Sequence, residues 1–172
     1  MRCREPPAGS DYLMKETHMP PITPFLWYDT QAEEAAKFYT SIFPNSSIVS
    51  VTRYGDAGPG PKGGVMTAVF TLDGQEFIAL NGGPQFQFTP ATSFVVKCKT
   101  QAEIDRYWDT LSAGGRQDRC GWLTDRFGLS WQIVPAGLNQ LLSRDAATAG
   151  RVMGALMQMA KLDIATLEAA AA

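Results

Sequence analysis

TPFLWYDTQAEEAAKFYTSIF, residues 23–43, and TSFVVKCKTQAEIDRYWDTLS, residues 92–112, are two versions of one pattern. The phenylalanine recurs 69 positions later (Phe25 to Phe94), and the tetrapeptide TQAE recurs after 70 positions (Thr30 to Thr100). In each copy TQAE follows a strand-like run of aromatic or branched residues and precedes a run with helical periodicity. An internal repeat of this kind predicts that the body of the chain consists of two copies of one unit.

The first copy continues through a helix and three strands. Apolar residues of QAEEAAKFYTSIF, residues 31–43, fall at helical spacing, and Pro44 and Asn45 end that helix. Three strand-like segments follow, SSIVSVTRY, VMTAVFTL and QEFIALN. A Gly/Pro loop separates the first two segments, and Asp73-Gly74, a typical two-residue hairpin turn, joins the last two. The predicted unit is therefore βαβββ.

The second copy repeats this order with shorter segments. Its helix ends at Gly114 and Gly115, and FGLSWQIVP, residues 127–135, is expected to form one buried strand. Residues 137–143 and 146–170 have helical patterns, and the longer one carries an apolar stripe that must pack on the body or on a second subunit. We predict an α+β protein of two tandem βαβββ modules followed by C-terminal helices. The expected boundaries are a disordered tail over 1–19, module one over 20–85, module two over 90–136 and the helices over 137–171.

The composition excludes several classes of partner. Lys and Arg number 15 and Asp and Glu number 17, so the net charge of −2 leaves no basic surplus for phosphate binding. No apolar run approaches the roughly 18 residues that a membrane helix needs. The three cysteines are an odd number and form no CxxC pair, which is typical of a reducing compartment. We expect a cytoplasmic protein that binds neither nucleic acid nor membrane, with Met1 or Met19 as the start of translation.

Four separate segments resemble one known family. They are ITPFLWYDTQAEEAAKFYTSIFPNSSI, FTLDGQEFIALNGGPQFQF, CGWLTDRFGLSWQIVP and RVMGALMQMAKLDIATLEAA. These segments resemble the PhnB-like family, often labelled 3-demethylubiquinone 3-methyltransferase-like, within the vicinal oxygen chelate superfamily of glyoxalase I, extradiol dioxygenases and bleomycin-resistance proteins. The resemblance implies the glyoxalase-like fold of tandem modules. It also implies a homodimer, because the relatives pair their modules across a two-fold axis.

The resemblance places the usual metal ligands on residues that cannot bind a metal. Metal-dependent relatives take one His, Gln or Glu from each of four strands, and these positions fall on Ile22, on Ile78 or Ala79, on Ala91 and on Gln132. One neutral amide cannot hold a divalent cation, which needs several oxygen or nitrogen donors. We therefore expect no metal, and neither glyoxalase I nor extradiol dioxygenase chemistry. We also expect no cofactor and consider methyltransferase activity unlikely, because GDAGPGPKGG has the prolines of a hairpin loop and no following helix.

Gln132 is the polar exception in an apolar strand, so it either bonds to a neighbouring backbone group or faces a ligand. The two-residue period of a strand puts Ser130 and Val134 on the same face as Gln132, and it puts Trp131 and Ile133 under the helices. The same alternation suggests further residues that line a cavity, namely Asn81, Phe77, Ser93, Val95, Leu26 and Tyr28. Trp122, in a Gly-flanked stretch, is a candidate floor for that cavity. The predicted ligand-binding set is Gln132, Asn81, Ser93, Trp122, Tyr28 and Ser130.

The sequence gives thin support for a catalytic residue. Cys120 has neighbouring arginines but no histidine that could act as a base, and Cys98 has the pattern of a core residue. Asp125 and Glu76 are expected to be solvated carboxylates. We therefore predict a small-molecule-binding protein whose cavity lacks the usual metal ligands. The alternative is an enzyme acting on a small oxygenated metabolite by lyase, isomerase or oxygenase-type chemistry.

Overall fold

The computed structural model describes residues 22–172, so the tail expected over residues 1–19 lies outside the described residues. The first module contains β1 (Phe25–Tyr28), α1 (Ala32–Ile42), β2 (Ser47–Arg53), β3 (Val65–Leu72) and β4 (Gln75–Asn81). The second contains β5 (Ser93–Cys98), α2 (Gln101–Ser112), β6 (Arg116–Gln117), β7 (Trp122–Thr124) and β8 (Ser130–Pro135). Three helices close the chain: α3 (Leu138–Leu142), α4 (Ala146–Gln158) and α5 (Ile164–Ala170).

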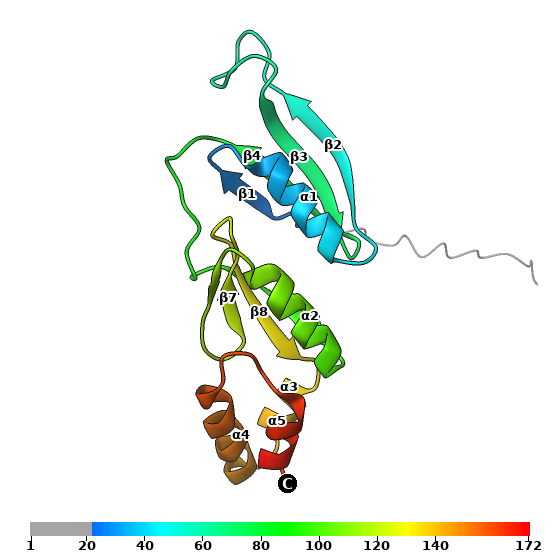
Figure 1. The fold of residues 1–172 in the computed structure, drawn as a ribbon, viewed down its shortest axis with the longest axis vertical. Coiled ribbons are helices and arrows are strands. Elements are labelled where there is room, and N and C mark those ends of the chain that lie inside the picture. The colour runs from blue at the N-terminus through cyan, green and yellow to red at the C-terminus, as the bar shows by residue number, and fades with distance from the viewer. Residues whose placement is uncertain (1–21) are drawn as a thin grey trace, which may run out of the picture.

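Each module is a four-stranded mixed sheet covered on one face by one helix (Figure 1). The strand order is β1-β4-β3-β2 in the first sheet and β5-β8-β7-β6 in the second, so the two sheets have the same topology. In both sheets the first strand pairs in parallel with the last strand of its unit, and the other pairings are antiparallel. The predicted α+β fold of two tandem modules is confirmed.

The repeated TQAE tetrapeptide begins a helix in both modules, but the two helix ends are capped differently. Thr100 caps α2 in a capping box with Glu103, in which each side chain accepts a hydrogen bond from the other residue's backbone N–H. In α1 no side chain of the preceding residue caps the helix. Instead, the amide oxygen of Asn81, at the end of β4, accepts a hydrogen bond from the Ala32 N–H at 2.7 Å. The second module thus closes its helix locally, whereas the first uses a distant strand.

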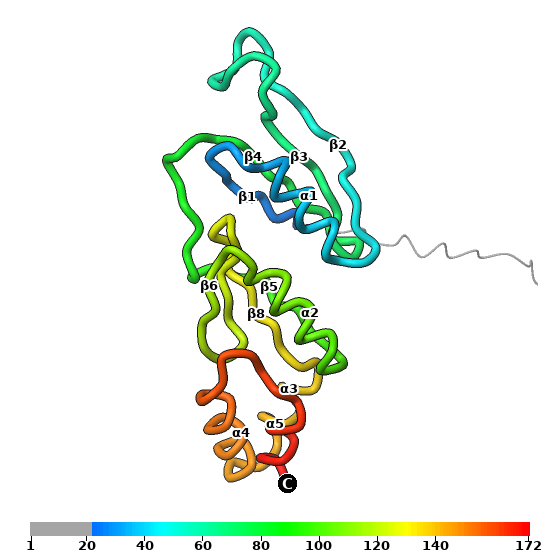
Figure 2. The backbone as a smooth tube through the Cα atoms, in the orientation of Figure 1, coloured from blue at the N-terminus to red at the C-terminus, as the bar shows by residue number. Residues whose placement is uncertain are grey.

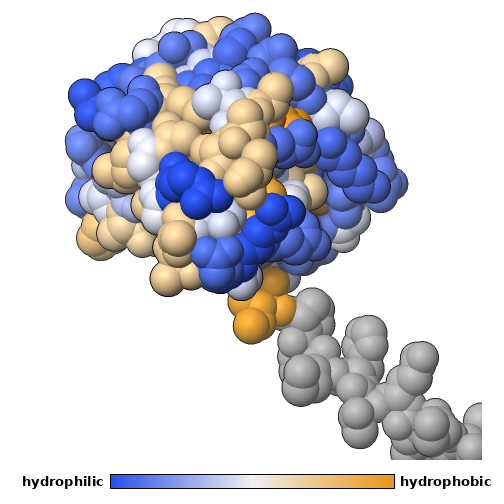
Figure 3. All heavy atoms as spheres, turned by 90° about the horizontal axis from the view of Figure 1, so that it is seen from below, coloured by the Kyte–Doolittle hydropathy of each residue, from blue (hydrophilic) through white to orange (hydrophobic). Residues whose placement is uncertain are grey.

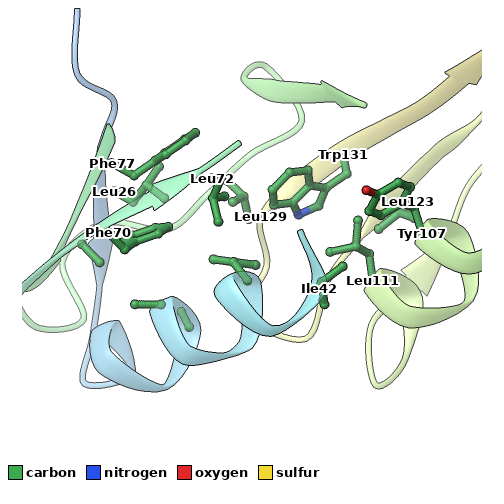
Figure 4. Close-up of a cluster of buried hydrophobic side chains, with 14 of the residues drawn as sticks. Leu26, Ile42, Phe70, Leu72, Phe77, Tyr107, Leu111, Leu123, Leu129 and Trp131 are labelled. Atoms are coloured by element: carbon green, nitrogen blue, oxygen red, sulfur yellow. The ribbon is translucent and has the colours of Figure 1, made fainter. Parts of the chain in front are cut away.

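The two modules share one core between them (Figure 4). Phe43, at the end of α1, stacks on both Tyr107 of α2 and Trp131 of β8, with ring centroids 5.2 and 5.5 Å apart. Phe77 of β4 meets Phe94 of β5 edge to face at 5.2 Å. Residues between β4 and β5 form the connection, which runs along the outside of the molecule in Figure 2. Aromatic packing therefore fixes how one module sits against the other.

The strand expected over residues 127–135 begins only at Ser130, so its first three residues were assigned wrongly. Asp125 explains the difference, because one of its carboxylate oxygens accepts from the backbone N–H groups of Phe127 and Leu129 at 2.8 and 3.1 Å. These bonds hold a turn, and Gly128 takes the positive φ of 89° that this turn requires.

The helix expected over residues 146–170 is also wrong, because it breaks into α4 and α5. The chain is extended at Met159, and Asp163 begins α5 by accepting from the Thr166 N–H. Leu162, in the break, is fully buried in a second small core with Val152, Leu156 and Leu167. The apolar stripe of the sequence therefore packs on this core and on the end of β8.

The end of the molecule that carries α3, α4 and α5 has a mixed surface (Figure 3). Weakly hydrophobic residues gather there between hydrophilic ones. Within residues 22–172, no helix has the length and apolar character needed to cross a membrane.

Candidate functional site

Each sheet has one face covered by its helix and one open face. In β8, Trp131 and Ile133 are buried on the covered side, whereas Gln132 and Val134 are partly exposed on the open side. The placement of Trp131 and Ile133 under the helices is therefore confirmed. The open face of the second sheet takes its residues from three neighbouring strands, and the register of those strands arranges them in rows.

Two of the rows on the open face of the second sheet carry predicted site residues, while a further row contains Lys97 and Val134, and Arg116 of β6 lies opposite Thr124. The first contains three hydroxyl side chains, since Ser130 of β8 lies opposite Ser93 of β5 on one side and Thr124 of β7 on the other. The second row is Val95, Gln132 and Trp122. The sheet thus brings together four of the six predicted ligand residues: Gln132, Ser93, Trp122 and Ser130. Their role in binding a ligand stays a prediction.

Gln132 makes one hydrogen bond to a member of the adjacent row. Its Nε2 donates to Ser93 Oγ at 2.9 Å. The bond is therefore to a side chain rather than to the backbone group that the alternative interpretation required. It joins the two rows and fixes the amide on the open face.

Ser130 is the unusual member of the hydroxyl row. Only 1% of the residue is exposed, yet its Oγ has no hydrogen-bond partner among the described residues. A buried hydroxyl without a partner costs about 1–3 kcal/mol relative to a satisfied one. Such groups are uncommon in folded proteins and therefore call for an explanation.

Several residues expected on the cavity side lie elsewhere. Leu26, Tyr28 and Phe77 are on the covered face, buried in the shared core, so their placement on the open face is wrong. Trp27, on the opposite side of β1, is the partly exposed one. The wrong face of β1 was predicted to be open because both of its faces carry aromatic residues. No polar residue marks the side that is exposed to solvent. Asn81 is occupied in capping α1, and its Nδ2 donates to the Val65 carbonyl at 3.1 Å.

Asp125 was expected to be solvated, but this is wrong because it is 2% exposed. Its second carboxylate oxygen accepts from Tyr39 Oη and from Trp131 Nε1, both at 2.8 Å. Burial raises the pKa of this carboxyl, although its four hydrogen bonds act in the opposite direction. Tyr39 belongs to module one, so the carboxylate ties the two modules together. In the sequence, only the position of Asp125 shortly before the segment FGL, residues 127–129, indicated a structural role for this carboxylate.

Four of the surface hollows formed by residues 22–172 lie along the loops and the junction of the modules. Tyr28 and Asn81 each line one of them, and Val95 of the second row lines another. Gln132, Ser93, Ser130 and Trp122 line none of these four. The second sheet of a single chain therefore offers Gln132, Ser93 and Trp122 on an open face, whereas Ser130 is buried between its neighbours.

The residues at the metal-ligand positions do not suit a divalent cation. Ile22 is 90% exposed, Ala79 is buried under α1, and Ala91 lies in the turn before β5. Within the described part of the chain, no three His, Cys, Asp or Glu side chains are grouped as a metal site would require. Gln132 alone offers one neutral oxygen. The donor set therefore does not fit the metal of the metal-dependent relatives.

Comparison with known proteins identifies the family. Residues 20–134 match the family model described as 3-demethylubiquinone-9 3-methyltransferase. A PhnB protein from Bacillus cereus with that description is 43% identical; the similarity covers 66% of this chain and 98% of that chain, with a TM-score of 0.61. Protein PA1353 from Pseudomonas aeruginosa is 22% identical over 68% of this chain and 98% of its own, with a TM-score of 0.57. No curated protein matches the sequence.

A fosfomycin resistance protein shares the fold at lower identity. FosX from Listeria monocytogenes, in its monoclinic form, is 16% identical over 75% of this chain and 99% of its own, with a TM-score of 0.51. The family model corresponds to the two modules, while α3, α4 and α5 lie beyond the matched residues. The chain belongs to the PhnB-like family, described as 3-demethylubiquinone-9 3-methyltransferase, of the vicinal oxygen chelate superfamily.

Proposed function

We propose that the protein binds a small molecule on the open face of its second sheet without a metal. The observation that carries this proposal is the buried Ser130 hydroxyl, which has no partner among the described residues. It lies between Ser93 and Thr124 and one row from Gln132. Because Ser130 is 1% exposed, a ligand reaches its hydroxyl only when a neighbouring side chain moves aside. The hydrogen bond would then recover about 1–3 kcal/mol that the free protein forgoes.

The rows also indicate the chemical class of the ligand. Ser93, Ser130, Thr124, Val95, Gln132 and Trp122 carry no charge. The charged residues of this face lie at its margins, where Lys97 is opposite Val134 and Arg116, opposite Thr124, is already paired with Asp118. The hydroxyl and amide groups of the two rows suit a neutral molecule with hydroxyl, carbonyl or amide groups. The partly exposed indole of Trp122 suits a flat or apolar part of the same molecule.

This site differs from the one described for a protein of the same fold. A FosX structure contains Mn(II) and 1S,2S-dihydroxypropylphosphonic acid, which is an anionic ligand beside a cation. The open rows of this chain carry neither a carboxylate nor an imidazole. We therefore propose that a phosphonate held through a metal ion is a poor ligand here.

A second copy of the chain would complete the site. The open faces expose large apolar residues, among them Phe25 at 57% and Val95 at 50% of their surface. Exposed apolar faces of this kind are typical of protein contacts. In the proposed homodimer, the open face of one chain covers that of the other, and the rows of the second sheet line the enclosed space.

The test is a search for a compound retained through purification. Purified protein is denatured, and the released small molecules are identified by mass spectrometry. We expect an uncharged compound from the parent chain, and much less of it from Gln132→Leu. The matched control is Gln158→Leu, at an exposed position on α4, which should retain the compound as the parent does.

Elemental analysis provides the second arm of the test. We expect no stoichiometric Zn, Ni, Mn or Fe in untagged protein. About one such metal per chain would contradict metal-free binding and favour an enzyme instead. A retained phosphonate or other anion would contradict the proposed class of ligand.

A further inference from the structure

Two sulfur atoms from separate elements meet at the surface. Cys120 precedes β7, Met157 lies in the last turn of α4, and their Sγ and Sδ atoms are 3.6 Å apart. Backbone bonds fix this contact, because the Cys120 N–H donates to the Met159 carbonyl and the Gly121 N–H donates to the Ala160 carbonyl, both at 2.8 Å. The thiol and the thioether are therefore held together by the chain on both sides.

The helix that carries Met157 brings another thioether, that of Met153, to the same surface. Met153 lies four residues before Met157, so both project from the same face of α4. They are 44% and 49% exposed, respectively. By contrast, Met159 is engaged in the fold, since its Sδ accepts from the Asp163 N–H at 3.5 Å. Met157 thus leaves its thioether open to solvent beside the thiol of Cys120, and Met153 presents a second exposed thioether one helical turn away.

We propose that Cys120 and Met157, with Met153 as a third donor, form a binding site for Cu(I). A thiolate and thioethers are soft ligands, which select Cu(I) over harder divalent cations. With metal–sulfur bonds of about 2.3 Å, two sulfurs about 4 Å apart subtend the roughly 120° of a trigonal site. The sulfurs of Cys120 and Met157 reach that separation by moving a few tenths of an ångström.

Binding is a simple exchange of a proton for the ion. The Cys120 S–H bond breaks, its proton goes to solvent, and a Cu(I)–thiolate bond forms with no change in oxidation state. The thiolate balances the single positive charge of Cu(I), so no further charged ligand is required. Zn(II), which takes four nitrogen, sulfur or oxygen donors, has too few ligands here.

The site joins Cys120, inside the part of the chain matched to the family, to two methionines of α4 outside it. Met153 and Met157 lie beyond residues 20–134, which are the residues shared with the family model. Cys120 lies two residues before Trp122 of the rows, but it makes its sulfur contact with α4 rather than with a row residue. Copper binding and small-molecule binding are therefore separate properties with separate tests.

The test is an anaerobic Cu(I) titration in competition with a chromogenic Cu(I) chelator, bathocuproine disulfonate. The titration uses the full chain with the substitution Cys3→Ser, so that Cys98 and Cys120 are the only thiols of the protein tested. Cys98 is 1% exposed, and burial raises the pKa of its thiol to about 11, so it does not compete. We expect one Cu(I) per chain, and protection of Cys120 from alkylation by iodoacetamide in the loaded parent.

Substitutions identify the ligands. Cys120→Ser should abolish binding, and Met157→Leu should weaken the affinity by about tenfold or more. Met66→Leu, in β3 of the other module, is the matched control and should bind as the parent does. Equal affinity in Met157→Leu and the parent, equal loss in Met66→Leu, or displacement of Cu(I) by Zn(II) would each overturn the proposal.

Discussion

Gln132 donates a hydrogen bond to Ser93 but remains partly exposed, so its substitution separates a ligand contact from a core contact. We expect Gln132→Leu to change the free energy of unfolding by less than about 1 kcal/mol, because water can replace the amide at the half-buried Ser93 hydroxyl. Urea unfolding of the variant beside the parent measures this change. A loss above about 2 kcal/mol would show that the amide is structural. Ser93→Ala is the companion variant and should behave alike.

Asp125 is the opposite case, because all four of its hydrogen-bond partners are donors. In Asp125→Asn an NH₂ group replaces one acceptor and faces two donors. We expect a loss of about 3 kcal/mol in the free energy of unfolding, since hydrogen bonds to a charged group contribute about 1.5–3 kcal/mol each. Tyr39→Phe removes one donor and should have about half the effect. A change below about 1 kcal/mol in Asp125→Asn, by urea unfolding, would contradict this role.

The buried carboxyl of Asp125 also predicts a pH dependence. Burial raises its pKa above the ordinary value of 3.8, so the folded chain holds this proton at a pH where the unfolded chain has lost it. The free energy of unfolding should therefore fall as the pH rises from 3.8 through the raised pKa. The contribution is the difference between the parent and Asp125→Asn, measured by urea unfolding over this range. A difference that grows with pH would show that the hydrogen bonds outweigh burial.

At the scale of elements, the sequence predicted the repeat but not the ends of several segments. The TQAE tetrapeptide located both helices because it marks the same helix start in each module. The turn before β8 depends on a side chain, Asp125, bonding to the backbone two and four residues later. The break between α4 and α5 depends on tertiary bonds to Cys120 and Gly121. Neither set of bonds leaves a periodic pattern, so hydrophobic spacing could not reveal them.

Ser130, Gln132, Ser93 and Trp122 were identified because a polar residue on an apolar strand shows which face is open. β1 has no such marker, since FLWY is apolar on both sides. Its parity was consequently assigned wrongly. The hydroxyl row was not recognised either, because the register that places Thr124 beside Ser130 is a property of the sheet.

Gly121 tests how strongly the C-terminal helices are tied to the second module. Its φ is +80°, and a Cβ there would lie 2.7 Å from the Ile133 carbonyl oxygen. We expect Gly121→Ala to lower the free energy of unfolding by more than about 1 kcal/mol, through backbone strain and displacement of β8. Gly150→Ala is the matched control, because nothing lies within 4 Å of its Cβ position on α4. That variant should gain about 0.5–1 kcal/mol from helix propensity.

For Gly121 and Gly150, thermal and urea unfolding followed by circular dichroism provide the measurement. Equal stability of Gly121→Ala and the parent would show that the loop before β7 can move away from the Ile133 carbonyl at no cost in stability. A simultaneous loss in Gly150→Ala would instead indicate that α4 packs on something at its outer face.

At the scale of the whole molecule, the open faces account for the expected homodimer. Each helix covers one face of its own sheet, so a single chain leaves the other faces without a covering layer (Figure 1). Proteins bury such apolar faces against a second layer, and here a second copy is the available one. Light scattering at micromolar concentration should therefore report about twice the chain mass of 18.7 kDa.

Val95 provides the variant that tests this assembly, since it is 50% exposed and lies beside Gln132 on the edge strand β5 of an open face. A carboxylate there would be buried without a partner in the dimer but solvated in the monomer. We expect Val95→Asp to be monomeric by light scattering, with unchanged circular dichroism, and to lose the retained compound together with its second subunit. Met153→Asp places the same charge on an equally apolar, 44% exposed position of α4 and should stay dimeric. A dimeric Val95→Asp would show that the open face of the second sheet is not the interface, and a monomeric parent would show that the site is complete within one chain.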